Sequence, residues 1–295
     1  MGFFVEAEIT SQPECWRRAA ALARELAPSL QRRGERIAFV GCGTSWFMAQ
    51  VLASWRESAG YGESDAFAAS EMPDRRYDRV IALTRSGTTT EVVDLLRSLR
   101  GRTPTAVVLG DLDTPVAEVA DEVVDLSFAD ERSVVQTRFA TSTLALFRGA
   151  YGADVAALAD AGEQAVVEPL AAGLAEAEQV SFLGRGWTIG LAHEAALKFR
   201  ETSSSWAESY PAMDYRHGPL AIAGPGRLVW MFGEPPSGLV DEVRATGATF
   251  VSSDQDPLVH LVVAQRVAVA RAIALGVDPD APRHLTRSVV LAGSA

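Results

Sequence analysis

The chain has 295 residues, of which 48% are hydrophobic and 22% charged, so it can bury one large core or two of ordinary size. Its formal net charge at pH 7 is −11. Binding to nucleic acid requires a basic surface that releases counterions, so this charge argues against a polyanionic partner. It does not exclude a small phosphorylated ligand, because a turn and a few donors hold a single phosphate locally.

Cysteine and histidine usage limits the cofactors and the compartment. Cys15 and Cys42 are the only cysteines, and they imply no disulfide framework in a chain of this length. The four histidines and two cysteines form no cluster at ligand spacing, so we expect no metal and no other cofactor. The N-terminus lacks a basic segment followed by an apolar run, and no stretch reaches the length of a membrane span. We therefore expect a cytoplasmic protein without a membrane partner.

The first half of the chain alternates short apolar runs with segments of helix length. A helical stretch over residues 14–30 precedes the first apolar run. Strands that alternate with helices form parallel sheets covered on both faces, so this half predicts a doubly wound sheet. The predicted strands are residues 36–40, 79–84, 105–110 and 122–127.

The second half repeats this layout after an Ala-rich stretch. Residues 150–178 have helical periodicity and are expected to connect the two halves as helix. Predicted strands follow at residues 180–186, 228–233 and 248–253, with helices between them. We therefore predict an α/β protein of two tandem doubly wound, flavodoxin-like domains, over residues 1–165 and 166–295.

Each half has a G-x-G turn after its first strand, at residues 41–43 and 184–186. Neither turn extends to the full G-x-G-x-x-G pattern with an acidic residue at ribose distance. The sequence therefore argues against a dinucleotide-binding fold.

The most informative segment follows the predicted strand at 79–84. It carries Thr84, Arg85 and Ser86, then Gly87 and three further threonines. Gly87 permits a tight turn with positive φ, and the first amides of the next helix have no partner within that helix. An oxyanion would be held by those amides and by the hydroxyls together. The alternative is that these residues only cap the helix, although one residue is enough for a cap.

A second hydroxyl turn carries Thr44 and Ser45, directly after the predicted strand at 36–40. Ligands of open parallel sheets bind beyond the carboxyl ends of the strands, so both turns are expected to face one crevice. Gln136 and Arg138 are placed to approach it from a third side. For Arg138, a solvated helix position is an equal alternative.

Three charged residues of the second half share one face of a predicted helix. Glu194, Lys198 and Glu201 are spaced i, i+4 and i+7. A surface salt-bridge ladder is one interpretation. The helix is otherwise largely apolar, however, and a partly buried carboxylate beside a lysine is a reasonable general base. His217, followed by a Gly-Pro pair, lies in a turn, where it is either catalytic or structural.

Nine motifs occur along the chain in a fixed order: GCGTS at 41–45, ASE at 69–71, TRSGTTTEV at 84–92, ERSVVQTR at 131–138, FLGRG at 182–186, HEAALKFRE at 193–201, YRHGPLA at 215–221, DQD at 254–256 and DAPRHLTRSV at 280–289. With these motifs the chain resembles the tandem sugar isomerase (SIS) proteins. It resembles in particular the isomerase half of glutamine–fructose-6-phosphate aminotransferase and the aminosugar-phosphate deaminase/isomerases. The resemblance covers nearly the whole chain.

The resemblance implies a sugar phosphate as the partner and a role for each matched residue. Glu201 would move a proton between C1 and C2 of the sugar. His217 would open the sugar ring from a neighbouring subunit, which implies a homodimer. The residues implied to bind the substrate are Gly43, Thr44, Ser45, Thr84, Arg85, Ser86, Thr89, Gln136 and Arg287.

Two features depart from the aminotransferase. The chain shows no glutaminase segment with a catalytic cysteine at its start, and Arg287 stands where that family places a lysine that forms a Schiff base. Arginine stays protonated and cannot do this. We therefore expect an enzyme that deaminates and isomerises an aminosugar 6-phosphate, releasing ammonia and a ketose phosphate. An aldose–ketose phosphate isomerase or a sugar-phosphate–amino acid deglycase would use nearly the same residues. A non-catalytic sugar-phosphate sensor is the alternative of another class.

Overall fold

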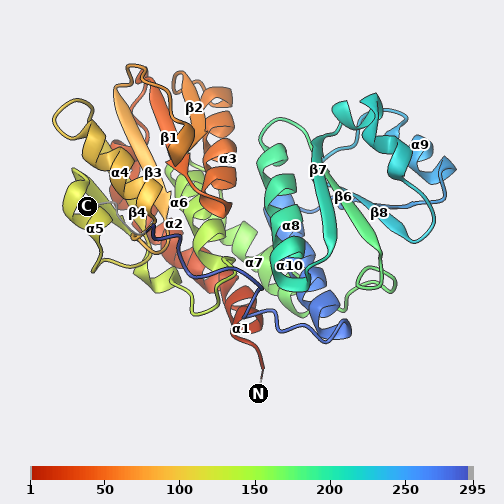
Figure 1. Ribbon diagram of the computed structural model, residues 1–295. Helices are drawn as coiled ribbons and strands as arrows, with labels where there is room; N and C mark the ends of the chain where they lie inside the picture. Colours follow the sequence, from red (N-terminus) through yellow and green to blue (C-terminus); the bar gives the residue numbers. More distant parts are fainter. Residues whose placement is uncertain (1, 292–295) are drawn as a thin grey trace. The chain divides into compact units, whose positions relative to one another are not determined.

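The structure is a computed structural model that describes residues 2–291 and divides into two compact units (Figure 1). Of these residues, 11–159 and 285–291 form the first unit, and 2–10 and 160–284 form the second unit. Each unit is built around its own parallel sheet. Helix α7 (Val155–Val167) contains the boundary between the units.

The sheet of the first unit has five parallel strands in the flavodoxin-like order β2-β1-β3-β4-β5. Three of these strands, β1, β3 and β4, are buried along their whole length, as is typical of strands covered on both faces. The strands are β1 (Ile37–Gly41), β2 (Ser64–Ala68), β3 (Arg79–Thr84), β4 (Thr105–Leu109) and β5 (Glu122–Asp125).

Helices cover both faces of this sheet. They are α2 (Gln12–Leu30), α3 (Thr44–Ser58), α4 (Thr90–Leu99), α5 (Pro115–Val119) and α6 (Arg138–Ala150), with short 3-10 helices η1 (Ala69–Glu71) and η2 (Ser127–Ala129). Ala38 and Val40 of β1 belong to a core that includes Val92 of α4. Phe39, which lies between them, packs edge-on against Phe147 of α6, with ring centroids 5.7 Å apart. Alternate residues of one strand therefore contact opposite helical layers.

The second unit has a four-stranded parallel sheet in the order β7-β6-β8-β9. Its strands are β6 (Gln179–Gly184), β7 (Trp206–Pro211), β8 (Arg227–Met231) and β9 (Thr249–Val251). Its other elements are α1 (Phe4–Thr10), α8 (Thr188–Ser203), α9 (Leu239–Ala245), α10 (Pro257–Ala274), η3 (Asp214–His217) and η4 (Pro219–Ile222). Phe182 packs against Phe199 of α8, whereas the next residue, Leu183, shares a core with Val243 of α9. This sheet is also covered on both faces.

The predicted alternation of strands and helices and the parallel sheets are confirmed, with two differences. The edge strands β2 and β7 are not among the predicted strands, because SDAFA and WAESYP mix polar and apolar residues without a continuous apolar run. The prediction of helix over residues 150–178 is wrong at residues 151–154, between α6 and α7, and again beyond α7. Pro169 lacks a backbone N–H and disfavours helix in the residue before it, and residues 168–178 are not helical.

The two ends of the chain belong to opposite units. The carboxylate of Asp280 accepts hydrogen bonds from the amides of Phe4 and Val5, at 2.6 and 2.8 Å, and so holds the start of α1 in the second unit. The tail, residues 285–291, belongs to the first unit. This arrangement differs from the predicted domains, which assign residues 2–10 to the first half and the tail to the second.

Helix α10 is long and apolar enough, by length and composition, to cross a membrane, with a mean hydropathy of 1.4 over 18 residues. The expectation that no stretch reaches the length of a membrane span is therefore wrong for α10. Within the second unit, 61% of this window is buried. Core helices of soluble proteins meet the same criteria, and α10 packs against α8 as such a helix does.

The contact of Asp280 with α1 predicts a graded loss of stability. Asp280→Ala removes both acceptors from the first amides of α1 and should lower the free energy of unfolding by about 1 kcal/mol. Asp280→Asn keeps one acceptor oxygen and should lose less. Urea denaturation followed by circular dichroism measures both. Equal losses for the two variants would show that hydrogen bonding at this position is not what stabilises α1.

Candidate active site

The first hydroxyl turn joins β1 to α3. Gly43 precedes the helix with φ of 54°, a conformation that side chains disfavour. Thr44 and Ser45 form the first turn of α3 and are buried. The amide of Ser45 donates to the carbonyl of Cys42 at 3.1 Å, and that of Phe47 to the carbonyl of Gly43 at 3.1 Å. The turn thus places the N-terminus of a 15-residue helix directly beyond the end of β1.

Cys42 lies within this turn. Burial raises the pKa of its thiol to about 11, so the thiol stays protonated near neutral pH. It therefore adds no negative charge where an anion would bind, and we assign it no nucleophilic role.

The second hydroxyl turn joins β3 to α4. Gly87 has φ of 62°, as predicted, and a Cβ atom there would lie 2.1 Å from Oγ1 of Thr114. The Gly87 amide donates to Oγ1 of Thr84 at 3.2 Å, and the Thr88 amide to Oγ of Ser86 at 3.4 Å. The hydroxyls of Thr84 and Ser86 therefore shape the turn. Since β1 and β3 are neighbouring parallel strands, both hydroxyl turns lie at the same edge of one sheet.

The start of α4 is not capped by its own threonine. Thr89 precedes the helix with an extended backbone, and its side chain makes no capping hydrogen bond. Instead, the amide of Thr90 donates to the carbonyl of Val289 at 3.1 Å. The cap is therefore supplied by the C-terminal tail, and capping by Thr89 does not account for the hydroxyls of this turn.

Glu131 is a residue that the sequence analysis did not single out. Its side chain is fully buried, and Oε1 accepts from the Thr137 amide at 2.5 Å, the Thr137 hydroxyl at 2.8 Å and the Arg138 amide at 2.8 Å. These groups lie at the start of α6, so the carboxylate caps that helix. Oε2 lies 4.0 Å from Nη1 of Arg85, which supplies the opposite charge. In the sequence, Glu131 is marked only as the first residue of the ERSVVQTR motif, a few residues before a helix start.

The two hydroxyl turns, at residues 41–45 and 84–90, are called the cradle from here on. Arg85 uses its guanidinium to hold backbone around it. Nη1 donates to the carbonyl of Ser133 at 2.8 Å. Nη2 donates to the carbonyls of Val134 at 3.3 Å and Arg287 at 3.2 Å. The resemblance implies that Arg85 binds the substrate, but the partners seen for this side chain are backbone carbonyls. Arg85 anchors two segments around the cradle.

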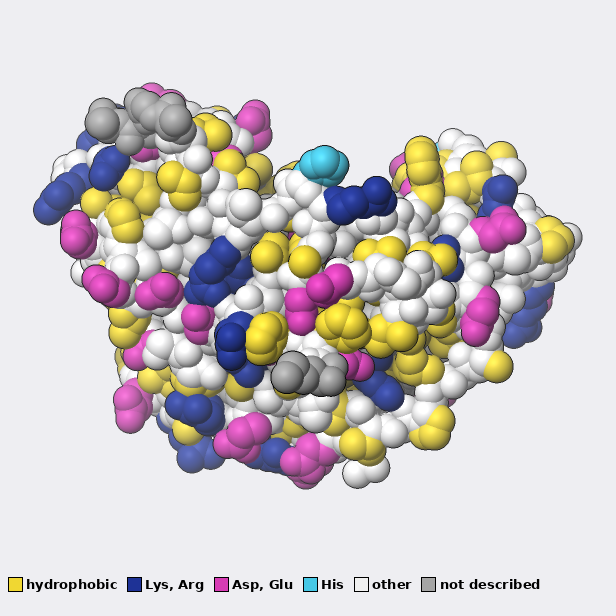
Figure 2. Space-filling view, turned by 60° about the horizontal axis from the view of Figure 1, so that its bottom comes forward, with side chains coloured by type: hydrophobic (Ala, Val, Ile, Leu, Met, Phe, Trp, Pro, Cys, Tyr) yellow, Lys and Arg dark blue, Asp and Glu magenta, His cyan; other side chains and the backbone are white. Residues whose placement is uncertain are grey.

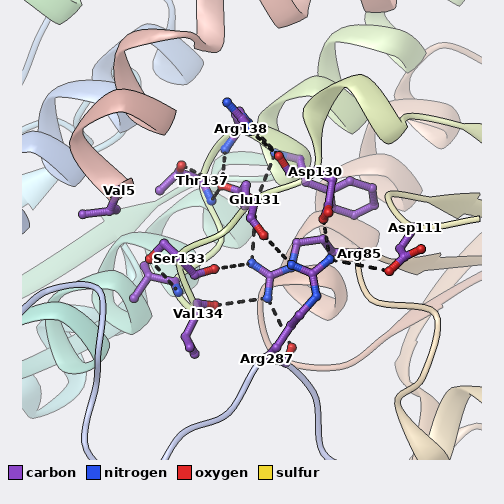
Figure 3. Close-up of polar contacts among 12 residues, drawn as sticks. Val5, Arg85, Asp111, Asp130, Glu131, Ser133, Val134, Thr137, Arg138 and Arg287 are labelled. Carbon is purple, nitrogen blue, oxygen red and sulfur yellow. Dashed lines mark hydrogen bonds and ion pairs between the residues drawn. The ribbon is translucent and has the colours of Figure 1, made fainter. Parts of the chain in front are cut away.

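Arg287 completes this network from the tail (Figure 3). Its Nη2 pairs with Oδ1 of Asp130 at 2.6 Å, and its Nη1 donates to the carbonyl of Glu131. Arg85 therefore binds the tail backbone, and Arg287 binds the loop that follows η2. The observed contacts of the Arg287 side chain secure the tail.

The tail then runs along the second hydroxyl turn. Oγ of Ser288 lies 2.8 Å from Oγ1 of Thr88, and the amide of Leu291 donates to Oγ1 of Thr90 at 2.9 Å. The tail thus borders the place where the turn would meet a ligand.

Gln136 lies in the loop between η2 and α6, which also carries Glu131. Its Oε1 atom is buried and has no hydrogen-bond partner among the described residues. A buried carbonyl without a partner is costly, and a bound hydroxyl or amine would satisfy it. This supports the expected place of Gln136 near a ligand.

In the second unit, α8 brings the predicted charged trio together. Nζ of Lys198 lies 2.5 Å from Oε2 of Glu201 and 3.5 Å from Oε1 of Glu194. The side chains of Lys198 and Glu194 are 2% and 0% exposed, whereas that of Glu201 is 18% exposed. Because two of the three side chains are buried, the trio is not a row of salt bridges on the protein surface. Glu201 is the member of the trio whose carboxylate is most accessible to a solute.

His217 ends η3, after β7, and Gly218 follows with φ of 136°. The histidine is exposed, and among the described residues its ring has no hydrogen-bond or ion-pair partner. His193, in contrast, is held by Ser209 through a 2.9 Å hydrogen bond, and burial lowers its pKa. Of these two histidines, His217 is the one available to another molecule.

The structure therefore groups the predicted residues by unit. The first unit brings together the two hydroxyl turns, Gln136 and Arg287. Glu201 and His217 lie in the second unit, on α8 and η3.

The buried pair of Glu131 and Arg85 predicts strong coupling. Arg85→Met alone leaves a buried carboxylate without its counter-charge and should lower the free energy of unfolding by about 3 kcal/mol. The double variant Arg85→Met/Glu131→Gln should lose less than the sum of the two single changes. Urea denaturation of the wild type and the three variants measures this coupling. Strict additivity would show that the two side chains act independently.

Parts of the chain are similar in sequence to a known domain family and to curated proteins. Residues 29–150 match the model of the SIS domain. The chain is 29% identical to the glutamine–fructose-6-phosphate aminotransferase of Xylella fastidiosa, over 90% of this chain and 53% of that protein. It is 27% identical to that of Methanothermobacter thermautotrophicus, over 98% of this chain and 57% of that protein. The chain spans about half the length of these curated relatives.

Solved structures share the fold over nearly the whole chain. Glucosamine-6-phosphate deaminase from Thermotoga maritima has a TM-score of 0.81 and 26% identity, over 97% of this chain and 99% of that one. Tagatose-6-phosphate ketose/aldose isomerase from Escherichia coli has a TM-score of 0.81 and 19% identity, over 98% and 96% of the two chains, a likeness of fold. The chain is therefore similar to the SIS domain over residues 29–150 and shares its overall fold with these two solved sugar-phosphate enzymes.

Proposed function

We propose that the protein is an aminosugar-6-phosphate deaminase/isomerase. The observation that carries the proposal is the pair of buried hydroxyl turns at one sheet edge, in a chain that also presents an accessible carboxylate held by a buried lysine. The similarity to glucosamine-6-phosphate deaminase supports the same substrate class. In this proposal the two units are tandem SIS modules, and the ligand is a small molecule.

The face shown in Figure 2 has acidic and basic side chains interspersed, without one large basic area of the kind that binds a polyanion.

The substrate phosphate would bind at the hydroxyl turns. Thr44, Ser45 and Thr89, at the starts of α3 and α4, supply hydroxyl donors, and the two helices supply the positive ends of their dipoles. The Arg85 and Arg287 side chains would shape this cradle without contacting the phosphate. Gln136 would bind a hydroxyl or the amine of the sugar through its unpartnered oxygen.

The chemistry requires an open-chain sugar and one base. His217 would transfer a proton to the ring oxygen as the C1–O5 bond breaks and the C1 hydroxyl loses its proton, which gives the aldehyde. Glu201 would then move the C2 proton to C1, while the aldehyde oxygen gains a proton and the amine loses one, and this converts the amino aldehyde into a C2 imine that carries a C1 hydroxyl. Addition of water to the imine and loss of ammonia give the ketose phosphate. Lys198 holds the Glu201 carboxylate in place through the 2.5 Å contact of its Nζ with Oε2.

We infer that His217 acts in the site of a partner subunit within a homodimer. The inference follows from the resemblance, which implies that this histidine acts from a neighbouring subunit. Trp206, at the start of β7, is 72% exposed, and Met213, between β7 and η3, is 51% exposed. An interface over this segment would cover these two apolar side chains.

Glucosamine 6-phosphate and galactosamine 6-phosphate test the activity directly. The wild type should release ammonia and ketose phosphate in equal amounts from at least one of them. Glu201→Gln should lower kcat by about a hundredfold or more, while inorganic phosphate still raises the melting temperature. Glu176→Gln, an exposed carboxamide replacement in the same unit, is the control and should leave kcat unchanged. Normal turnover by Glu201→Gln would contradict its role as the base. Isomerisation of an aldose phosphate with no ammonia from either aminosugar would favour the isomerase alternative.

Mixing two inactive variants tests the shared site. A dimer of one Glu201→Gln and one His217→Ala subunit would hold one intact site if histidine crosses the interface. After subunit exchange, equal mixing should restore about a quarter of the wild-type activity, since half of the dimers are mixed and each has one working site. No recovery, with exchange verified by mass spectrometry, would place both residues in one subunit's site.

A further inference from the structure

The segment that carries His217 is anchored in the core of the second unit on both sides of the histidine. Tyr215, two residues earlier, is fully buried and belongs to a core formed with side chains of β6, β8 and α9. Leu220, three residues later, packs against the same core. His217 itself lies exposed between these two anchors. The place of its ring therefore depends on its immediate neighbours in the chain.

The neighbour on the C-terminal side, Gly218, adds freedom rather than restraint. Its φ is 136°, and a Cβ atom there would meet no atom of the described residues within 4 Å. Glycine has more backbone freedom than any other residue. The restraint next to the histidine therefore lies on its other side, at Arg216.

Arg216 is held by a two-point ion pair with Glu242 in the first turn of α9. Its Nε donates to Oε2 at 2.6 Å, and its Nη2 donates to Oε1 at 2.9 Å. Nη2 also donates to the carbonyl of Ser237 at 2.7 Å. Gly238, with φ of 79°, turns the chain between these two acceptors. Pairing of a planar guanidinium through two bonds fixes its orientation as well as its distance, so this contact ties η3 to α9.

This ion pair is too accessible to contribute much to the stability of the fold. The side chains of Arg216 and Glu242 are 20% and 44% exposed. Exposed ion pairs add little to the free energy of unfolding, because water solvates both partners well in the unfolded chain and salt screens their attraction. A pair with precise geometry and little value for stability would instead act on the position of the residue beside it.

We propose that Glu242 is a positioning residue, which holds η3 through Arg216 and so places the ring of His217 for opening the sugar ring. This inference rests on the proposed function, in which His217 transfers a proton to the ring oxygen. A displacement of about 1 Å can lower the rate of such a step about a hundredfold. Glu242 itself would touch neither the substrate nor the reacting atoms.

A substrate that cannot close a ring gives this proposal a specific test. The 4,5-dideoxy analogue of the aminosugar 6-phosphate that the wild type turns over has no hydroxyl able to form a five- or six-membered ring, so it needs no ring opening. Glu242→Ala should lower kcat about tenfold on the natural sugar and leave kcat on the analogue unchanged. His217→Ala should show the same pattern more strongly. Asp241→Ala removes the neighbouring exposed carboxylate of α9 and should change neither value.

Hydrogen–deuterium exchange measures the anchoring of η3 without any turnover. Glu242→Ala should speed exchange about threefold or more in peptides that cover residues 214–218, whereas Asp241→Ala should not. The melting temperature of Glu242→Ala should stay within about 2 °C of the wild type. Unchanged exchange, unchanged kcat on the natural sugar, or an equal loss of kcat on both substrates would overturn the proposal. A wild type that releases no ammonia would instead overturn the proposed function, and the exchange rates would still decide whether Glu242 anchors η3.

Discussion

The arrangement around the cradle depends on one buried carboxylate. Glu131 has no access to water, and such a charge is tolerated only when an opposite charge and hydrogen bonds surround it. Arg85 provides the charge, and the start of α6 provides the donors. Arg85 also binds the backbone of Arg287. A single electrostatic requirement thus connects the β3–α4 turn, the loop before α6 and the C-terminal tail, which are far apart in sequence.

In this network, the groups that fix the shape of the cradle are not the groups proposed to bind the ligand. The guanidinium groups nearest the hydroxyl turns are occupied by carbonyls and an aspartate, so the proposed anion would meet hydroxyls and helix amides instead. Neutral donors that are already fixed need little rearrangement when a ligand binds or leaves. A phosphate held in this way would be positioned without a strong ion pair. Weak binding of the phosphate suits an enzyme whose product also carries it and must leave the site.

Local patterns predicted much of the fold and of the cradle. Apolar runs located β1, β3 and β4, and Gly87 does have the positive φ that a tight turn requires. The role of Glu131 could not be predicted, because its partner Arg85 lies 46 residues earlier and the contact exists only after the sheet has formed. The tail was missed for the same reason, and β2 lacks the apolar run that marks a buried strand. The roles of Glu201 and His217 remain proposals that follow from the family resemblance.

The exchange of chain ends between the units has a consequence for biosynthesis. Most of the first unit precedes the second unit in the sequence, yet the segment that supplies the cap of α4 follows it. During translation the start of α4 is therefore made long before the residue that caps it. A chain that stops before residue 285 would keep all five strands of this sheet but lack the closing segment.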